Sequence, residues 1–330
     1  MNIDIHAHII LPEVLREVDP TDAWRPRVFR DEQGRQKVEH GGKVAGSAPR
    51  EFVDIERILA EQQAAAVDLV VLSPWTSLIN YDLSAEECRR TCRLQNDALA
   101  RRVRDHPRHV AGMGIVPLPD PHPAAQEAEY IARDLGLPAI EVGTNVNGTY
   151  LGDEKLLPFW ERVAALDIFV FVHPVPGIGG PMMRQYELWN LFGNPSETGL
   201  TTASLIFGGV LERFPSLKIC MAHGGGVLPY IIGRLDRGYQ VRPAAKESKI
   251  TRPPSTYLRQ LYFDTITHSA EALRYLVQVV GADHVLLGSD YPFDMGYERP
   301  RDLVDRLGMS ADQSNAILGA TAAQLLKIER

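Results

Sequence analysis

The sequence is poor in cysteine and contains no long hydrophobic run. Its 330 residues include three cysteines, which are too few for a disulfide framework, so we expect all three to be packing thiols. The longest apolar runs, such as residues 67–72, have the length of a strand and fall far short of the ~20 residues that cross a bilayer. Residues 1–4 show neither a basic nor an apolar leader region. We therefore expect a cytoplasmic protein that does not act at a membrane.

An excess of positive charge is also missing. The chain has 35 lysines and arginines against 42 aspartates and glutamates, a formal net charge of −7. One arginine-dense patch, residues 101–104, lies among acidic neighbours in a helical pattern. Nucleic acid is therefore not an expected partner. The proportions of apolar residues, 45%, and charged residues, 23%, are typical of a globular enzyme with a large core.

The glycine signatures of two enzyme classes are absent. No Gly-x-Gly-x-x-Gly turn follows an early strand, which argues against a dinucleotide-binding sheet, and we expect no organic cofactor. A His-Gly-Gly-Gly run at residues 223–226 is similar to the oxyanion loop of lipases. However, no Gly-x-Ser-x-Gly nucleophile elbow accompanies it, so the pattern does not indicate a serine hydrolase.

What the sequence does contain is a regular series of strand-sized apolar runs, with room for one helix between each pair. Such runs are buried on both faces, which indicates a parallel sheet. Eight of them in one series predict a closed (β/α)₈ barrel of the TIM type, with catalytic groups at the carboxyl ends of the strands. An open doubly wound sheet is the alternative. The predicted strands are residues 2–6, 68–73, 110–117, 139–144, 168–173, 217–223, 261–265 and 284–290.

Two connections are longer than a barrel requires. Residues 9–52 follow the first strand, and residues 174–194 follow the fifth and contain several glycines and aromatic residues. Long loops after barrel strands often act as lids or bind substrate, although a surface excursion without a role is the plainer alternative. We predict one domain over residues 1–330, with residues 9–52 as a lid-like insertion within it. Helical patterns fill most other connections, including residues 197–214.

Metal-binding side chains recur where the predicted strands end. His6 and His8 end the first strand, and in a strand residues i and i+2 share a face. His173 ends the fifth strand, His223 the sixth and Asp290 the eighth. Each of these alone is more simply explained as a polar residue at a strand end, but five of them meeting at one rim predict a metal centre.

The donor types indicate which metal to expect. His6, His8, His173 and Asp290 offer three nitrogens and one oxygen, a set that suits Zn²⁺. The fourth strand ends without a lysine that could bridge two metals, so we predict one Zn²⁺ per subunit. His223 then remains free to act as a general acid or base beside the metal.

Taken together, these motifs resemble the amidohydrolase superfamily, and within it the branch typified by 2-amino-3-carboxymuconate-6-semialdehyde decarboxylase. The resemblance extends over nearly the whole chain and is densest at residues 204–215, 222–226 and 288–293. It implies the barrel fold, Zn²⁺ binding by the four residues above, and a catalytic role for His223 and Asp290. It also implies that Arg234, eleven residues after His223, reaches a substrate carboxylate of the neighbouring subunit in a homodimer.

The chain departs from this branch in two places. Pro174-Val175-Pro176 and a glycine-rich insertion stand where members carry a tryptophan after His-Pro, so the substrate is expected to differ. A second substrate arginine belongs in the first long loop, where Arg50 is the best candidate. Tyr186 and Phe293 are candidate walls of the substrate pocket, with core packing as the simpler alternative.

The sequence therefore predicts a metal-dependent, non-oxidative decarboxylase of an unsaturated or aromatic carboxylic acid, used in the catabolism of aromatic compounds. A hydrolase of a lactone or amide is the first alternative, because the same metal and histidine suit attack on a carbonyl. A hydratase is the second. A barrel with a purely structural zinc is a third, which would leave His223 without a role.

Overall fold

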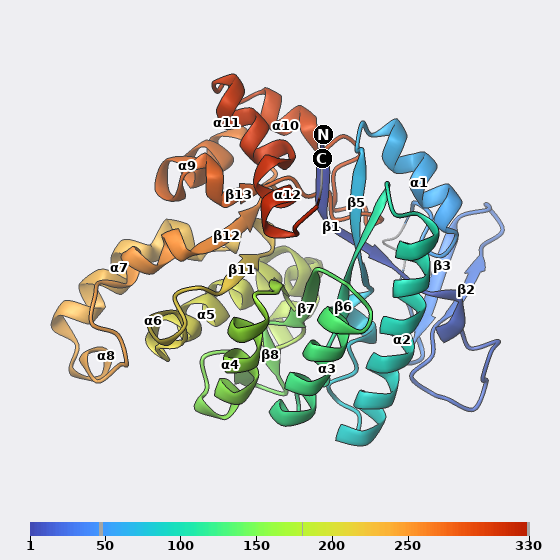
Figure 1. Ribbon diagram of the computed structural model, residues 1–330, viewed down its shortest axis with the longest axis horizontal. Helices are drawn as coiled ribbons and strands as arrows, with labels where there is room; N and C mark the ends of the chain where they lie inside the picture. Colours follow the sequence, from blue (N-terminus) through green and yellow to red (C-terminus); the bar gives the residue numbers. More distant parts are fainter. Residues whose placement is uncertain (46–48, 180, 329–330) are drawn as a thin grey trace.

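The computed structural model describes residues 1–45, 49–179 and 181–328, and it has the predicted barrel at its centre (Figure 1). Eight parallel strands form one sheet in the order β1-β5-β6-β7-β10-β11-β12-β13. Each strand of this sheet pairs with the next barrel strand along the chain, as repeated βα units require. The strands are β1 Ile3–Ile9, β5 Leu69–Pro74, β6 Val110–Ile115, β7 Ala139–Gly143, β10 Phe169–His173, β11 Lys218–Met221, β12 Leu261–Asp264 and β13 Val285–Leu286.

The sheet closes where the segment after β13 meets β1. The Ile5 amide donates to Leu287 O at 2.9 Å, and the Asp290 amide donates to His6 O at 2.8 Å. The regular ladder of the eighth strand ends at Leu286, four residues before the predicted end at residue 290. Beyond Leu286, a side chain accepts one of the backbone hydrogen bonds of this segment: the Ser289 amide donates to Asp4 Oδ1 at 3.0 Å.

Helices cover the outside of the barrel. The longest, α2, is fixed at its start by a capping box in which Ser84 and Glu87 satisfy each other's backbone amides. Around the barrel the helices are α1 Ile55–Ala64, α2 Ala85–Asp105, α3 Pro121–Arg133, α4 Leu157–Leu166, α5 Asn194–Phe207, α6 Val210–Arg213, α7 Leu228–Val241, α8 Pro243–Lys246, α9 Ala270–Val280, α10 Arg301–Asp305, α11 Ala311–Asn315 and α12 Thr321–Leu325. None of these helices is long and apolar enough to span a membrane.

The predicted helix over residues 197–214 is in fact two helices. The first ends at Phe207, and Gly208 then approaches Gly152 so closely that a Cβ would lie 2.2 Å from Gly152 O, which only glycine allows. Gly209 then adopts a left-handed backbone with φ +76°. The short α6 follows the break.

Two apolar layers hold the barrel together. The inner layer fills the barrel with residues such as Ile3, Ile5, Phe169 and Phe171, and α12 packs against the amino ends of the strands. The outer layer lies between the strands and the surrounding helices. The inner layer leaves only the carboxyl ends of the strands available for a site.

The long segment after β1 contains structure that the sequence pattern did not indicate. It forms a three-stranded antiparallel sheet of β2 Arg27–Arg30, β3 Gln36–His40 and β4 Lys43–Ala45. Val38 from this sheet packs with Ile10, Phe52 and Trp75 in a separate apolar cluster. The segment is therefore packed against the carboxyl rim of the barrel through its own small core.

Candidate metal centre and active site

The four predicted metal ligands meet at the carboxyl rim of the barrel. Each of His6, His8, His173 and Asp290 offers one atom to a cluster whose atoms all lie within 4.8 Å of one another, and all four residues are buried. Asp290 Oδ1 lies 3.3 Å from His6 Nε2 and 3.6 Å from His8 Nε2. The sequence-based grouping of these residues is thus reproduced by the fold.

The second nitrogen of each imidazole is held by a partner outside the cluster. Nδ1 of His6 lies 2.7 Å from Asp264 Oδ2, that of His8 lies 3.1 Å from Ser73 Oγ, and that of His173 lies 2.9 Å from Pro174 O. A carboxylate and a carbonyl require a donor, so His6 and His173 each carry a proton on Nδ1, and Nε2 is the nitrogen that faces the cluster and can bind a metal once it is deprotonated.

The atoms that face one another in the cluster lack partners of their own. The Nε2 atoms of His6, His8 and His173 and Oδ1 of Asp290 are buried and accept or donate no hydrogen bond. Buried polar atoms are rarely left in this state. Three imidazole nitrogens and a carboxylate oxygen aimed at one point fit a divalent transition metal such as Zn²⁺ or Mn²⁺.

The electrostatics of the cluster favour a cation. Burial lowers the pKa of His8 and that of His173, so both rings are neutral at neutral pH. Burial would also lower the pKa of His6, but Asp290 and Asp264 outweigh it and raise this pKa to about 10. Burial opposes ionisation of Asp290 as well, yet His6 and the other surrounding imidazoles hold its pKa well below the usual range. Without a metal, the proton on His6 supplies the positive charge that this carboxylate requires.

His223 lies beside the cluster and is not one of its four ligands. Its Nε2 is 3.4 Å from Asp290 Oδ2, and its side chain is 15% exposed, which leaves it open to a substrate. Its backbone is left-handed, with φ +54°, at the start of the short turn η6 (His223–Gly225). A non-glycine residue held in this conformation is costly, so the turn must be fixed by its surroundings.

Asp264, at the end of β12, provides that fixation. Its carboxylate accepts from the amides of His223 at 2.9 Å and Gly224 at 2.8 Å, and it also holds His6 Nδ1. One buried carboxylate therefore orients both a metal ligand and the candidate acid–base residue. The sequence analysis did not single out Asp264, although its place at the end of a predicted strand was a usable signal.

A second residue that the sequence analysis missed lies one layer deeper in the barrel. Glu141 on β7 is the register partner of Phe171, whose ring is 4.7 Å from that of His6. Glu141 is fully buried and neither carboxylate oxygen has a hydrogen-bond partner. Burial raises the pKa of Glu141 to about 8, and the nearby Ser73 hydroxyl offsets only part of this effect. Glu141 is therefore protonated at neutral pH.

One of the predicted substrate residues, Phe293, lies next to the cluster, and a second, Arg50, is bound to the segment that carries Phe293. The Phe293 ring is 5.6 Å from that of His8. Arg50 packs its guanidinium 4.6 Å above the Tyr291 ring and donates weakly to the carbonyl oxygens of Phe293 and Tyr297, both at 3.4 Å. Arg50 is therefore tied to the segment that follows Asp290.

The other two lie on the surface of the chain. The side chain of Tyr186 is 82% exposed, and Arg234 is exposed on α7. Neither is part of the buried cluster of its own chain, so a role for either in substrate binding stays a prediction.

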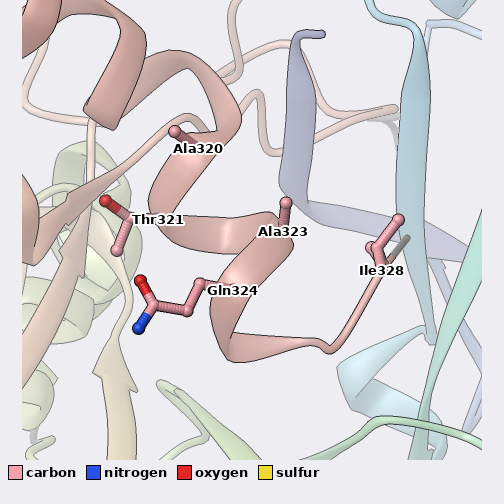
Figure 2. Close-up of a pocket in the computed structure, with 5 residues that line it drawn as sticks. All are labelled: Ala320, Thr321, Ala323, Gln324 and Ile328. Atoms are coloured by element: carbon pink, nitrogen blue, oxygen red, sulfur yellow. The ribbon is translucent and has the colours of Figure 1, made fainter. Parts of the chain in front are cut away.

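A hollow elsewhere on the molecule does not offer comparable chemistry. It has a volume of about 320 Å³ and lies at α12, at the amino ends of the strands (Figure 2). Its lining residues are Ala320, Thr321, Ala323, Gln324 and Ile328. None of these five residues ionises or is a common metal ligand, so this hollow offers no chemistry comparable to that of the cluster.

Comparisons with known proteins identify the family of the chain and agree with its fold. A family model described as amidohydrolase matches residues 3–328. A relative from Dictyostelium discoideum, named 2-amino-3-carboxymuconate-6-semialdehyde decarboxylase, is 33% identical and covers 100% of this chain and 92% of its own.

Solved structures give the same fold. IDCase from Metarhizium anisopliae, in its apo form, has a TM-score of 0.86 at 21% identity and covers 100% of this chain and 98% of its own. A dihydroxybenzoic acid decarboxylase from Polaromonas sp. JS666, solved with manganese and the inhibitor 2-nitroresorcinol, has a TM-score of 0.83 at 22% identity, covering 100% and 97%.

These findings bear on three sequence-based predictions. The barrel is confirmed by the strand order and by the solved structures. The decarboxylase name of the full-length relative agrees with the predicted class, a metal-dependent carboxy-lyase. The family model leaves out only a few residues at the two ends of the chain, and the chain belongs to the amidohydrolase family.

Proposed function

We propose that this protein is a Zn²⁺-dependent, non-oxidative decarboxylase of an unsaturated or aromatic carboxylic acid, with one Zn²⁺ per subunit and no organic cofactor. The observation that carries this proposal is the convergence of four unpartnered buried donor atoms beside a partly exposed histidine. The full-length relative named as a decarboxylase of an amino-carboxymuconate semialdehyde supports the class of substrate.

The metal, when bound by His6, His8, His173 and Asp290, supplies a Lewis acid that draws electron density from the substrate. The chain supplies the proton. His223 lies at the open side of the cluster, where a proton can pass between its imidazole and the substrate. Asp290 Oδ2 orients that ring, and Asp264 holds the turn that carries it.

The proposed reaction is balanced without an oxidant or reductant. The bond between the substrate carbon and its carboxylate breaks, and the electron pair stays on the carbon. A proton delivered by His223 forms the new C–H bond, and CO₂ leaves. His223 then regains a proton from solvent through its exposed edge.

Cationic side chains favour an acidic substrate. Arg50 lies beside Phe293 at the rim of the site, and a guanidinium matches a carboxylate in a two-point contact. A neutral lactone or amide would leave this charge without a partner. We propose that Arg50 holds a carboxylate of the substrate and that Phe293 forms one wall of its pocket.

We further propose a homodimer in which Arg234 completes the neighbouring site, with Tyr186 at that shared boundary. Arg234 is exposed on α7, and α7 and the turn η5 (Trp189–Gly193) both pack against α5. Large apolar side chains on these elements and on the preceding turn η4 (Pro181–Glu187) are exposed, as an interface requires. They are Tyr186, Trp189, Leu191, Phe192 and Tyr230.

The reaction is tested by offering the zinc-loaded protein a panel of unsaturated and aromatic acids. CO₂ in a one-to-one ratio with a product lighter by one carboxyl group supports the proposal. A product heavier by one water, without CO₂, would move the protein to the lactone hydrolase, amidase or hydratase class. Metal analysis of the purified protein should give about one ion per chain, and two tightly held ions would contradict the single site.

A further inference from the structure

One buried carboxylate outside the metal cluster has an unusual set of partners. Glu197, in the first turn of α5, is 1% exposed. Its oxygens accept from Tyr150 OH at 2.9 Å, Asn145 Nδ2 at 3.1 Å, Thr144 Oγ1 at 3.3 Å and, in a short contact, the Ile178 amide. All four donors are neutral. A buried carboxylate loses its hydration, and donated hydrogen bonds offset that loss. Each of these four positions therefore needs a donor that faces Glu197.

Three of these four donors connect Glu197 to the segment that follows the metal ligand His173. Ile178 belongs to that segment. The Thr144 hydroxyl that donates to Glu197 also accepts from the Val175 amide at 3.2 Å. The Asn145 amide group that donates to Glu197 also donates to Pro176 O at 3.3 Å. Residues 175, 176 and 178 are thus fixed by one carboxylate and its partners.

A glycine in this segment shows how closely it approaches Glu197. A Cβ built on Gly177 would lie 2.3 Å from Glu197 Oε1, so with any other residue either the segment or the Glu197 carboxylate would have to shift and the contact between them would change. Pro176 and Gly177 are themselves exposed, and the protein surface offers them little packing. The position of the segment therefore depends on Glu197.

His173 is the ligand that depends on this segment. His6 and His8 are oriented by buried side chains on strands, Asp264 and Ser73. His173 is oriented by a backbone carbonyl, Pro174 O, the first residue after β10. A shift of the segment would move that carbonyl and turn the His173 ring.

We propose that Glu197 is a positioning residue for the metal site: it anchors residues 174–178, whose Pro174 carbonyl oxygen sets the orientation of His173. The inference uses only the ligand set and holds whichever reaction the protein performs. It predicts that Glu197 controls metal affinity from a different element, without touching the metal ligand.

The test is the affinity of the full-length protein for Zn²⁺, measured by competition with a chromophoric chelator. Glu197→Gln replaces one acceptor oxygen with an NH₂ group that faces donors, so the anchor is lost. We expect Zn²⁺ to bind ~10-fold to 100-fold more weakly, the effect typical of groups that orient metal ligands. Gly177→Ala should weaken binding similarly, because it displaces the segment from the opposite side and leaves α5 intact.

The matched control is Tyr150→Phe. It removes one hydrogen bond from the same carboxylate but keeps the backbone pairing of Tyr150 with Asn145, and the lost hydroxyl makes no hydrogen bond to residues 174–178, so Zn²⁺ affinity should stay within about twofold of wild type. Thermal unfolding of the metal-free proteins separates stability from affinity. Wild-type affinity in Glu197→Gln, or equal loss in Tyr150→Phe, would overturn the proposal. If Glu197→Gln fails to fold, Gly177→Ala decides: wild-type affinity in that variant also overturns it.

Discussion

Glu141 makes the stability of the metal-free protein depend on pH in a direction opposite to that of most carboxylates. Its carboxyl group is fully buried without a hydrogen-bond partner, and burial raises its pKa from 4.5 to about 8. Between these two pH values the folded chain keeps a proton that the unfolded chain has lost. The folded state therefore binds more protons, and its stability falls as pH rises through this window.

The size of the effect follows from the same interval. Raising the pH from 4.5, the unfolded pKa, to about 8, the folded pKa, lowers the unfolding free energy by ~5 kcal/mol. The part of this loss that falls between pH 6.5 and 8 is ~2 kcal/mol. Glu141→Gln has nearly the same shape and never ionises. Relative to wild type, this variant should gain ~2 kcal/mol of unfolding free energy between pH 6.5 and pH 9.

Urea unfolding of the chelator-treated proteins at these two pH values measures the gain. The control is Glu86→Gln on the exposed face of α2, which removes the same charge without burial and should change stability by less than ~0.5 kcal/mol at either pH. A Glu141→Gln advantage that is the same at pH 6.5 and pH 9 would refute the reasoning. It would mean that water or a rearrangement solvates the carboxylate inside the barrel.

Three further predictions concern the site itself. His223→Ala should keep its Zn²⁺ and lose ~10²-fold or more in kcat, whereas His173→Ala should lose the ion. Metal analysis together with steady-state rates distinguishes the two variants. Loss of metal in His223→Ala would mean that His223 is a ligand. Zn²⁺ binding at pH 7.5 should release about one proton, because the pKa of His6 is about 10 without metal. Calorimetric titration in two buffers of different ionisation enthalpy gives the number of protons released. Release of no proton would contradict a protonated His6 in the metal-free protein. Mixing Arg234→Ala with His223→Ala under subunit exchange should restore about a quarter of wild-type activity through mixed dimers, and no recovery would place Arg234 outside the neighbouring site.

The barrel and the grouping of the four candidate metal ligands were predictable because each depends on a local pattern. An apolar run identifies a buried strand, and a histidine at its end is placed at the carboxyl rim by the topology alone. His6, His8, His173 and Asp290 needed no knowledge of which strand pairs with which. The sequence pattern was sufficient for the ligands, since every strand of a closed parallel barrel delivers its last residues to the same place.

The groups that orient the ligands were not predictable in this way. The contact between His6 and Asp264 joins residues 258 positions apart, and it depends on the register by which the segment after β13 closes the barrel against β1. Glu197 has the appearance of an ordinary acidic residue in the first turn of a helix. Only the folded chain reveals that it is buried and faces the segment after β10.

The long segment after β1 was missed for a different reason. Its strands are short and mostly polar on one face, so no run of apolar residues marks them. Val38 and Phe52 are buried in a cluster with Ile10, which follows β1, and Trp75, which follows β5. Their burial is a property of the tertiary structure and has no local signature.

The connection after β10 is therefore divided between two tasks. Its first residues, 174–178, are bound to Glu197 and orient His173, so changes there would alter the metal site. Its later part carries Tyr186 and Trp189, whose exposed rings are free of such contacts to the metal ligands. This division would let the later residues change without loss of the ligand set, provided that Gly177 and Glu197 stay in contact. Under the proposed role of Tyr186, substrate preference would vary through these later residues while the ligand set stays the same.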